Sequence, residues 1–219
     1  MNSIRIFIGY DPREAVAYHT CVQSIIDNAS DPTRLSFTPI TGPMRDGSNA
    51  FIYARFLVPY LCGFQGRAIF LDGDMIVRSD IGKLWEHDLS YVGVRVVKHD
   101  YKTKHPVKYL GNPNADYPRK NWSSVILWNC NFFPNRVLTP EFVAKQPGSF
   151  LHRFSWLPDH QIGELSSSWN RLVLEQDVRP DDDLLHYTIG TPCFAEYADC
   201  DYAEEWHETY ARAIAPMRT

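Results

Sequence analysis

Strand-like and helix-like patterns alternate over the first 75 residues, and acidic residues follow two of the apolar runs. The segments are a β-rich run at 3–9 (SIRIFIG), a helical periodicity at 13–28, a second strand at 35–40, mixed helical spacing at 49–62 and an apolar run at 67–71 (RAIFL). Such alternation indicates an α/β fold with parallel strands, in which ligands bind at the carboxyl ends of strands. Asp11 and the Asp72-Gly73-Asp74 segment both occupy such ends. We therefore expect the functional site there.

Beyond residue 75 the pattern is less regular. We expect strands at 91–97, 125–128 and 172–174, a long loop at 98–120, a helix near 159–166, an apolar stretch ending at His186 and a helix at 203–213. Loops as long as 98–120 are commonly functional. The sequence shows no internal repeat and no low-complexity linker, so the simplest expectation is a single domain over residues 1–219.

Composition excludes several classes of protein. A formal net charge of -4 gives no electrostatic footprint for nucleic acid, although a local basic patch could hold a phosphorylated small molecule. No window is apolar enough to span a membrane and the first residues do not resemble a signal peptide, so we expect no membrane span and a cytoplasmic location. The five cysteines include no CxxC pair, which favours reduced thiols over a disulfide framework or a zinc site.

The strongest local motif is the carboxylate pair of Asp72 and Asp74. The pair follows one apolar run and precedes a second, Met75-Ile76-Val77, where two like charges are costly unless a cation joins them. Two carboxylates separated by Gly73 can converge on one hard cation, because glycine permits a sharp turn and leaves space for the ion. A solvated turn is the alternative reading of an isolated D-x-D segment.

Two carboxylates leave coordination positions to fill, and we expect His186 to be the third protein ligand. A mixed oxygen and nitrogen set favours Mn²⁺ or Mg²⁺ over structural zinc, which prefers closed Cys and His tetrahedra. A lone histidine is more often an ordinary core or surface residue. His186 is distinguished from the other seven histidines by a family resemblance.

Residues 50–85 (AFIYARFLVPYLCGFQGRAIFLDGDMIVRSDIGKLW) resemble the signature block of the family-eight glycosyltransferases, relatives of glycogenin and of bacterial lipopolysaccharide galactosyltransferases. The matching positions are Tyr53, Arg55, Leu71, Asp72, Asp74, Val77, Asp80, Ile81, Leu84 and Trp85. Further similarities follow in the family's order: Asp11, the SSVILWN segment at 123–129, Asp159-His160-Gln161 at the family's D-Q-D, Trp169-Asn170, and His186 with Gly190 and Pro192.

The resemblance implies a GT-A fold, a Rossmann-like single domain with a mixed central sheet that binds a nucleotide sugar. It implies a UDP-sugar first, with Mn²⁺ or Mg²⁺ held by Asp72, Asp74 and His186 bridging the diphosphate. The family usually transfers a hexose with retention of anomeric configuration. The acceptor would be a carbohydrate, a lipid-linked acceptor or another hydroxyl.

By the same resemblance, Tyr10 and Asp11 would face the nucleoside and Arg55 would contact the donor. Asp159 and His160 would lie at the transferred sugar, where the family's debated nucleophile position falls. The donor-binding set also includes Gly73, Asp100 and Gly190. Three of these residues also have a purely structural interpretation. Asp11 could be a helix N-cap, with Glu14 completing a capping box, Arg55 could form a salt bridge, and Asp100 could be a solvated loop carboxylate.

The chain also departs from the family pattern. The family's C-terminal motif, H-x-x-G-x-x-K-P-W, places a lysine on the diphosphate, whereas the segment from His186 to Phe194 places its glycine one residue later and has no lysine. A cation must then come from elsewhere or be dispensed with. The aromatic loop at 98–122 would suit an acceptor cleft, or its rings could pack the loop onto the sheet.

Three functions remain open from the sequence. The leading one is a metal-dependent glycosyltransferase. A nucleotidyltransferase or phosphosugar enzyme could use the same carboxylate pair, and a catalytically silent module could bind a sugar nucleotide.

Overall fold

The computed structural model describes residues 3–43 and 49–215. Its strands are β1 (Ile4–Gly9), β2 (Leu35–Ile40), β3 (Arg67–Leu71), β4 (Met75–Val77), β5 (Val94–Val96), β6 (Val125–Asn129), β7 (Ile162–Glu164), β8 (Arg171–Leu172) and β9 (Leu184–His186). Its α-helices are α1 (Ala15–Asn28), α2 (Val58–Leu61), α3 (Ile81–Trp85), α4 (Pro140–Lys145), α5 (Gly148–His152) and α6 (Ala203–Ala213).

The strands form two sheets. The main sheet has the order β2-β1-β3-β6-β5-β7, in which β1 pairs in parallel with β2 and β3, and β6 pairs antiparallel with β3 and β5. A small sheet has the order β4-β9-β8. The expected mixed central sheet is confirmed. The carboxyl ends of β1 and β3 lie at one edge, because Ile8 is the register partner of Leu71.

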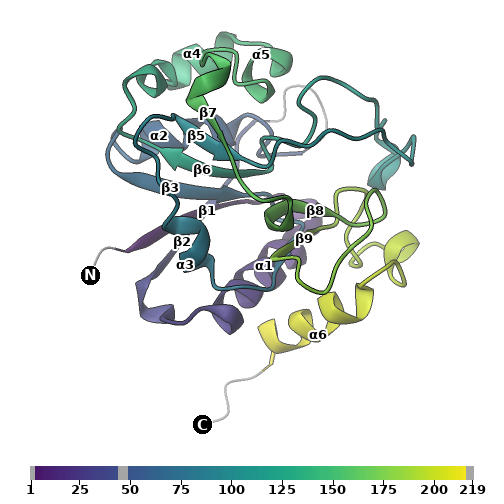
Figure 1. The fold of residues 1–219 in the computed structure, drawn as a ribbon. Helices are drawn as coiled ribbons and strands as arrows, with labels where there is room; N and C mark the ends of the chain where they lie inside the picture. The colour runs from purple at the N-terminus through teal and green to yellow at the C-terminus, as the bar shows by residue number, and fades with distance from the viewer. Residues whose placement is uncertain (1–2, 44–48, 216–219) are drawn as a thin grey trace.

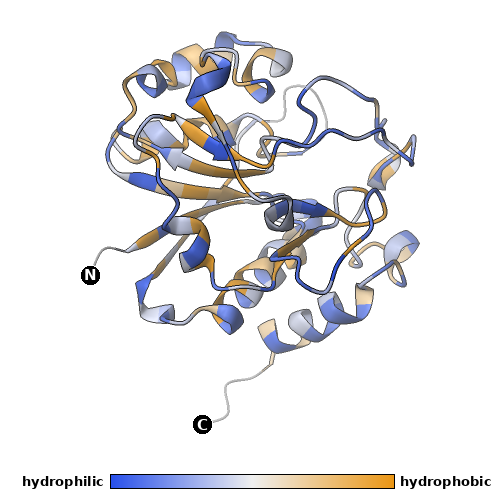
Figure 2. Cartoon of the chain, viewed as in Figure 1, coloured by the Kyte–Doolittle hydropathy of each residue, from blue (hydrophilic) through white to orange (hydrophobic). Residues whose placement is uncertain are grey.

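Helices cover both faces of the main sheet (Figure 1). On one face, α2, α4 and α5 enclose a core that includes Phe56, Trp128 and Phe154. On the other face, α1 contributes Cys21 and Ile25 to a second core, and α6 packs against the outer side of α1. Apolar residues in Figure 2 accordingly follow the strands and the inner sides of the helices. Within the described residues, no helix is long and apolar enough to cross a membrane.

The structure corrects one expected helix. Residues 159–166 form a 3-10 turn, η6 (Asp159–Gln161), followed by the edge strand β7, which pairs in parallel with β5 through Val94 and Ile162. Tertiary pairing with an available sheet edge thus overrides the local pattern. The expectations for β2 and α6 are confirmed, and 98–120 is a loop interrupted by the 3-10 turn η4 (Tyr109–Gly111).

Gly73 separates the two carboxylates at the point where β3 leaves the sheet. A Cβ atom there would lie 2.4 Å from the backbone oxygen of Gly9, which is closer than any real contact. Gly73 is not among the residues with positive φ. The position therefore requires glycine because the ends of β1 and β3 approach closely, rather than because the turn needs a left-handed conformation.

We expect Gly73→Ala to lower the free energy of unfolding by about 1–3 kcal/mol, because two backbone segments must separate to admit the methyl group. Gly42→Ala is the matched control, since its nearest neighbour would be Ala54 Cβ at 3.5 Å, an ordinary contact. Urea denaturation of both variants measures the difference. Equal stabilities would contradict the steric argument.

Candidate functional site

Strand pairing brings the carboxylate pair to His186. Asp72 follows β3, Asp74 precedes β4, and the antiparallel register of β4 with β9 places Met75 opposite His186. The backbone N–H of Tyr187 donates to the carbonyl of Asp74 at 2.9 Å, which continues this pairing by one residue. One ligand atom from each of Asp72, Asp74 and His186 lies within 4.8 Å of the others.

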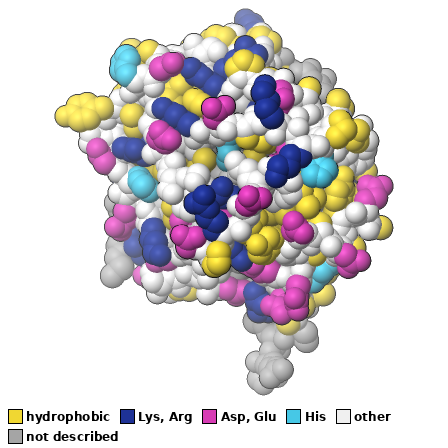
Figure 3. Space-filling model, turned by 45° about the vertical axis from the view of Figure 1, so that its right-hand side comes forward, with side chains coloured by type: hydrophobic (Ala, Val, Ile, Leu, Met, Phe, Trp, Pro, Cys, Tyr) yellow, Lys and Arg dark blue, Asp and Glu magenta, His cyan; other side chains and the backbone are white. Residues whose placement is uncertain are grey.

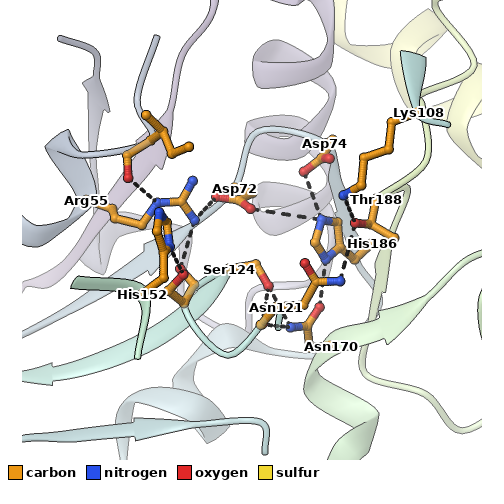
Figure 4. A network of polar contacts seen from close by, with 12 residues as sticks. Arg55, Asp72, Asp74, Lys108, Asn121, Ser124, His152, Asn170, His186 and Thr188 are labelled. Atoms are coloured by element: carbon orange, nitrogen blue, oxygen red, sulfur yellow. Dashed lines mark hydrogen bonds and ion pairs between the residues drawn. The ribbon is translucent and has the colours of Figure 1, made fainter. Parts of the chain in front are cut away.

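The hydrogen bonds of His186 fit a cation site. Nδ1 of His186 lies 2.9 Å from the side-chain oxygen of Asn170, whose amide nitrogen donates to Ser124 Oγ at 2.8 Å. Nδ1–H must then be the donor, which directs Nε2 toward the two carboxylates. Nε2 faces Asp74 Oδ1 at 3.3 Å and Asp72 Oδ2 at 4.0 Å (Figure 4). One imidazole nitrogen and two carboxylates that face one another are a set of groups that could hold one cation.

The carboxylates themselves are strongly perturbed. Burial raises the pKa of Asp72 to about 6 against the opposing effect of Arg55, and the like charge of Asp74 adds to the rise. Burial also acts to raise the pKa of Asp74, but the attraction of His186 and Lys108 outweighs it and the pKa falls below the usual value. Oδ1 of Asp74 is buried and accepts no hydrogen bond from the described residues.

Arg55 holds the first carboxylate from the other side. It lies on the 3-10 helix η3 (Ala54–Leu57), is 4% exposed, and places Nη1 at 2.7 Å from Asp72 Oδ1 and 2.9 Å from the carbonyl oxygen of Ser123. Its guanidinium lies over the rings of Phe51 and Phe70. The structure therefore shows the salt bridge, and Arg55 also lines the cavity at the site.

A cavity of about 420 Å³ opens at this cluster. Its walls come from the end of β3, from η3, from the loop 98–120, from the segment before β6 and from α5. The residues that matter for its chemistry are Arg55, Asp72, Asp74, Lys108, Lys120, Asn121, Ser123, His152, Arg153, His186 and Thr188. The face of the molecule drawn in Figure 3 intersperses Lys and Arg side chains with Asp and Glu. The size suits a small ligand.

Sequence reasoning did not single out the polar pair of Ser123 and His152. Ser123 Oγ lies 2.7 Å from Nδ1 of His152, and Nε2 of His152 is buried without a hydrogen-bond partner in the described part of the chain. Burial lowers the pKa of His152 to about 3, so the imidazole is neutral at pH 7. The pair joins α5 to the segment before β6, and both residues belong to the lining of the cavity.

Tyr10 and Asp11 lie at the end of β1 and outside the cavity lining. The buried carboxylate of Asp11 accepts hydrogen bonds from the backbone and side chain of Arg13 and from the backbone of Ala50. Burial acts to raise the pKa of Asp11, but these hydrogen bonds lower it below the usual value. Asp11 caps η1 (Pro12–Glu14), and Tyr10 packs edge-on against Tyr18.

The other predicted donor-binding and catalytic residues are dispersed. Asp100 is exposed on the loop after β5, and Gly190 is buried where a Cβ would collide with Tyr197 at 2.3 Å. Asp159 and His160 are exposed on η6, and the Asp159 side chain, 86% exposed, forms an ion pair with Arg119 at 2.5 Å. None of these residues lines the cavity among the described residues. Their predicted roles stay predictions.

Glu14 does not complete the expected capping box. Its Oε1 instead accepts a hydrogen bond from the hydroxyl of Tyr109 at 3.2 Å, which ties the loop 98–120 to the start of α1. Burial is the main cause that raises the pKa of Glu14 to about 8, and the negative charge of Asp74 contributes. The contact cannot be predicted from local sequence patterns, because the two partners lie 95 positions apart in the chain.

Comparison with known proteins identifies the family. The chain is 40% identical to Protein CDI of Arabidopsis thaliana over 219 aligned positions, which cover 92% of this chain and 84% of that protein. The chain therefore belongs to the same family as Protein CDI. No protein-family model matches it.

Solved structures with the same fold are glycosyltransferases. The galactosyltransferase LgtC in complex with donor and acceptor sugar analogs superposes with a TM-score of 0.64 at 13% identity, over 97% of both chains. The bifunctional glycosyltransferase WbbM gives 0.66 at 17% identity, over 96% of this chain and 50% of that chain. GlyE of Streptococcus pneumoniae TIGR4 gives 0.66 at 14% identity, over 99% and 61%.

These similarities confirm the expected GT-A fold, and with it the resemblance to family-eight glycosyltransferases at the level of the fold. The chain spans half of WbbM and nearly all of LgtC. At such identities the superposition shows only that the fold is shared. Any argument for an activity must come from the residues of the site.

We expect Glu14→Gln to stabilise the protein at alkaline pH and to have little effect at pH 5. The pKa of Glu14 is raised from 4.5 to about 8 in the folded state, which therefore binds the proton more tightly than the unfolded state does. The free energy of unfolding consequently falls as pH rises through that window. Glutamine keeps the acceptor for Tyr109 and does not ionise. Urea unfolding at pH 5 and pH 8.5 should show the gain rising to roughly 1–3 kcal/mol.

Glu208→Gln, an exposed position on α6, is the control and should show no such growth with pH. A Glu14→Gln difference that is the same at both pH values would contradict a buried, neutral Glu14.

Proposed function

We propose that this protein is a metal-dependent glycosyltransferase. It moves a hexose from a nucleotide sugar, with a UDP-sugar as the first choice, to a hydroxyl of a saccharide or another acceptor, with retention of configuration. The observation that carries the proposal is the convergence of Asp72, Asp74 and His186 at the wall of a cavity in a GT-A fold. The fold neighbour LgtC, bound to donor and acceptor sugar analogs, supports the substrate class.

Asp72, Asp74 and His186 would hold Mn²⁺ or Mg²⁺. A divalent cation supplies Lewis-acid stabilisation of the negative charge that develops on a leaving diphosphate. Asn170 keeps Nε2 of His186 directed at the carboxylates, and Arg55 fixes Asp72 through a buried ion pair. The chain's own residues thus set the orientation of the three metal-ligand side chains before any ligand binds.

The roles proposed for Asp159 and His160 at the transferred sugar require a rearrangement. Asp159 would have to release Arg119 before its carboxylate could turn toward the cavity. Ser123 and His152, by contrast, already line the cavity. Tyr10, Asp11, Asp100 and Gly190 remain proposed donor contacts that lie outside the described lining of the cavity.

We expect Mn²⁺ together with UDP to raise the melting temperature by about 5–10 °C at ligand concentrations near 100 times the dissociation constant. Asp74→Asn should abolish this shift because it removes one charged ligand from the cluster. Asp181→Asn, an exposed carboxylate in the turn before β9, should retain it. Differential scanning fluorimetry measures all three proteins.

An undiminished shift in Asp74→Asn would contradict the metal assignment.

Product analysis with a panel of UDP- and GDP-sugars, and with nucleoside triphosphates plus sugar phosphates, separates the remaining functions. Release of nucleoside diphosphate supports the glycosyltransferase, release of pyrophosphate from a nucleoside triphosphate with a sugar phosphate indicates a nucleotidyltransferase, and binding without turnover indicates a silent module.

A further inference from the structure

Lys108 places an ammonium group beside the acidic cluster from a loop that is far from it in sequence. Its Nζ donates to Thr188 Oγ1 at 3.0 Å, two residues beyond His186. Lys108 and Thr188 both line the cavity, and Figure 4 shows them on the side of the cluster opposite to Arg55. Among the described residues this is the one hydrogen bond of the ammonium, so two of its three N–H donors stay available to a ligand.

The backbone around Lys108 is firmly held. The N–H of Tyr109 donates to the carbonyl of Ile189 at 2.8 Å, and the N–H of Lys108 donates to Asn112 at 2.8 Å. The Tyr109 ring stacks on Phe194 with centroids 5.1 Å apart, and its hydroxyl binds Glu14. These contacts hold the backbone of Lys108 at the cavity before a ligand arrives.

Glu175 anchors the rest of the loop. Its buried carboxylate accepts hydrogen bonds from the backbone of Lys104 at 2.7 Å and from the side chain of Asn114 at 3.0 Å. Lys120 is the other lysine in the cavity wall, but its ammonium donates to Asn114 Oδ1 and to the carbonyl of Ala115. Lys120 therefore supports the loop, whereas Lys108 faces the cluster.

The charges of the site explain what Lys108 is for. Without a ligand, Arg55 and Lys108 balance the negative charges of Asp72 and Asp74. A divalent cation on the acidic cluster would leave an excess of about two positive charges, with Lys108 repelled by the ion. Lys120 and Arg153 in the same wall add to the excess, and the carboxylate of Glu175 behind the loop offsets part of it. A phosphate group with two negative charges, bound between the cation and Lys108, would offset the repulsion between them.

We propose that Lys108 binds the terminal phosphate of the nucleoside diphosphate, opposite to the metal ligands. The inference rests on the proposed function, since it takes the nucleotide sugar as substrate. It adds that the loop 98–120, rather than the segment after His186, supplies the cation for the phosphate. Lys108 is in this sense a phosphate-binding residue that the family pattern does not mark.

Lys108→Met tests the proposal, with Lys104→Met as the matched control, because Lys104 is an exposed lysine on the same loop outside the cavity lining. Isothermal titration gives the affinity for UDP or GDP, whichever the wild type binds more tightly, in the presence of Mn²⁺. A separate titration gives the affinity for Mn²⁺ alone.

We expect Lys108→Met to weaken nucleoside diphosphate binding by about 10- to 100-fold, as for loss of a charge-assisted hydrogen bond. Binding of Mn²⁺ alone should become tighter by about two- to tenfold, because a repelling charge is gone. The penalty should be larger for the diphosphate than for the corresponding monophosphate. Lys108→Arg should restore most of the loss, and Lys104→Met should change neither affinity.

Several results would overturn the proposal. Unchanged diphosphate affinity in Lys108→Met would exclude a phosphate contact, and parallel loss of Mn²⁺ and diphosphate binding would indicate a structural role. If Lys108→Met does not fold, Lys108→Gln takes its place in the same titrations. A wild-type protein that binds Mn²⁺ but neither UDP nor GDP would refute the proposed function itself, and this inference with it.

Discussion

The mutual repulsion of the carboxylates of Asp72 and Asp74 is the constraint around which the site is built. Both carboxylates are largely buried, at the end of β3 and just before β4, so that water screens their charges only in part. The protein offsets part of the cost with Arg55, whose guanidinium lies 2.7 Å from Asp72 and is itself satisfied by the carbonyl of Ser123. The remainder of the cost is what a bound cation would relieve.

Local patterns sufficed to predict the part of this arrangement that lies along one strand. The run 67–71 followed by Asp72 predicted both a strand and a carboxylate at its end, because burial and termination are properties of neighbouring residues. His186 was predicted through the family resemblance, and its approach to Asp74 depends on the register of β4 with β9. No local spacing in the sequence predicts such a register, since the partners Met75 and His186 lie 111 positions apart.

Other features escaped prediction because they depend on tertiary contacts. The amide of Asn170 orients His186, yet nothing in the local sequence says which of its neighbours an asparagine will bind. The 159–166 segment has a helix-like pattern, and the free edge of β5 draws it into β7. The C-terminal helix was predicted with its boundaries, since its amphipathic pattern needs one partner face, which α1 provides.

The loop 98–120 shows how a segment without regular structure can still be part of a preorganised site. Glu175 binds its backbone, Tyr109 links it to α1 and Phe194, and Lys108 is carried between these anchors. Because these contacts already order the loop, a ligand that contacts Lys108 binds without the free-energy cost of ordering it. The ammonium of Lys108 itself donates a hydrogen bond to Thr188 Oγ1 at 3.0 Å. Because Lys108 and the acidic pair line the same cavity, a phosphate group bound there could contact both the lysine and a cation held by the carboxylates.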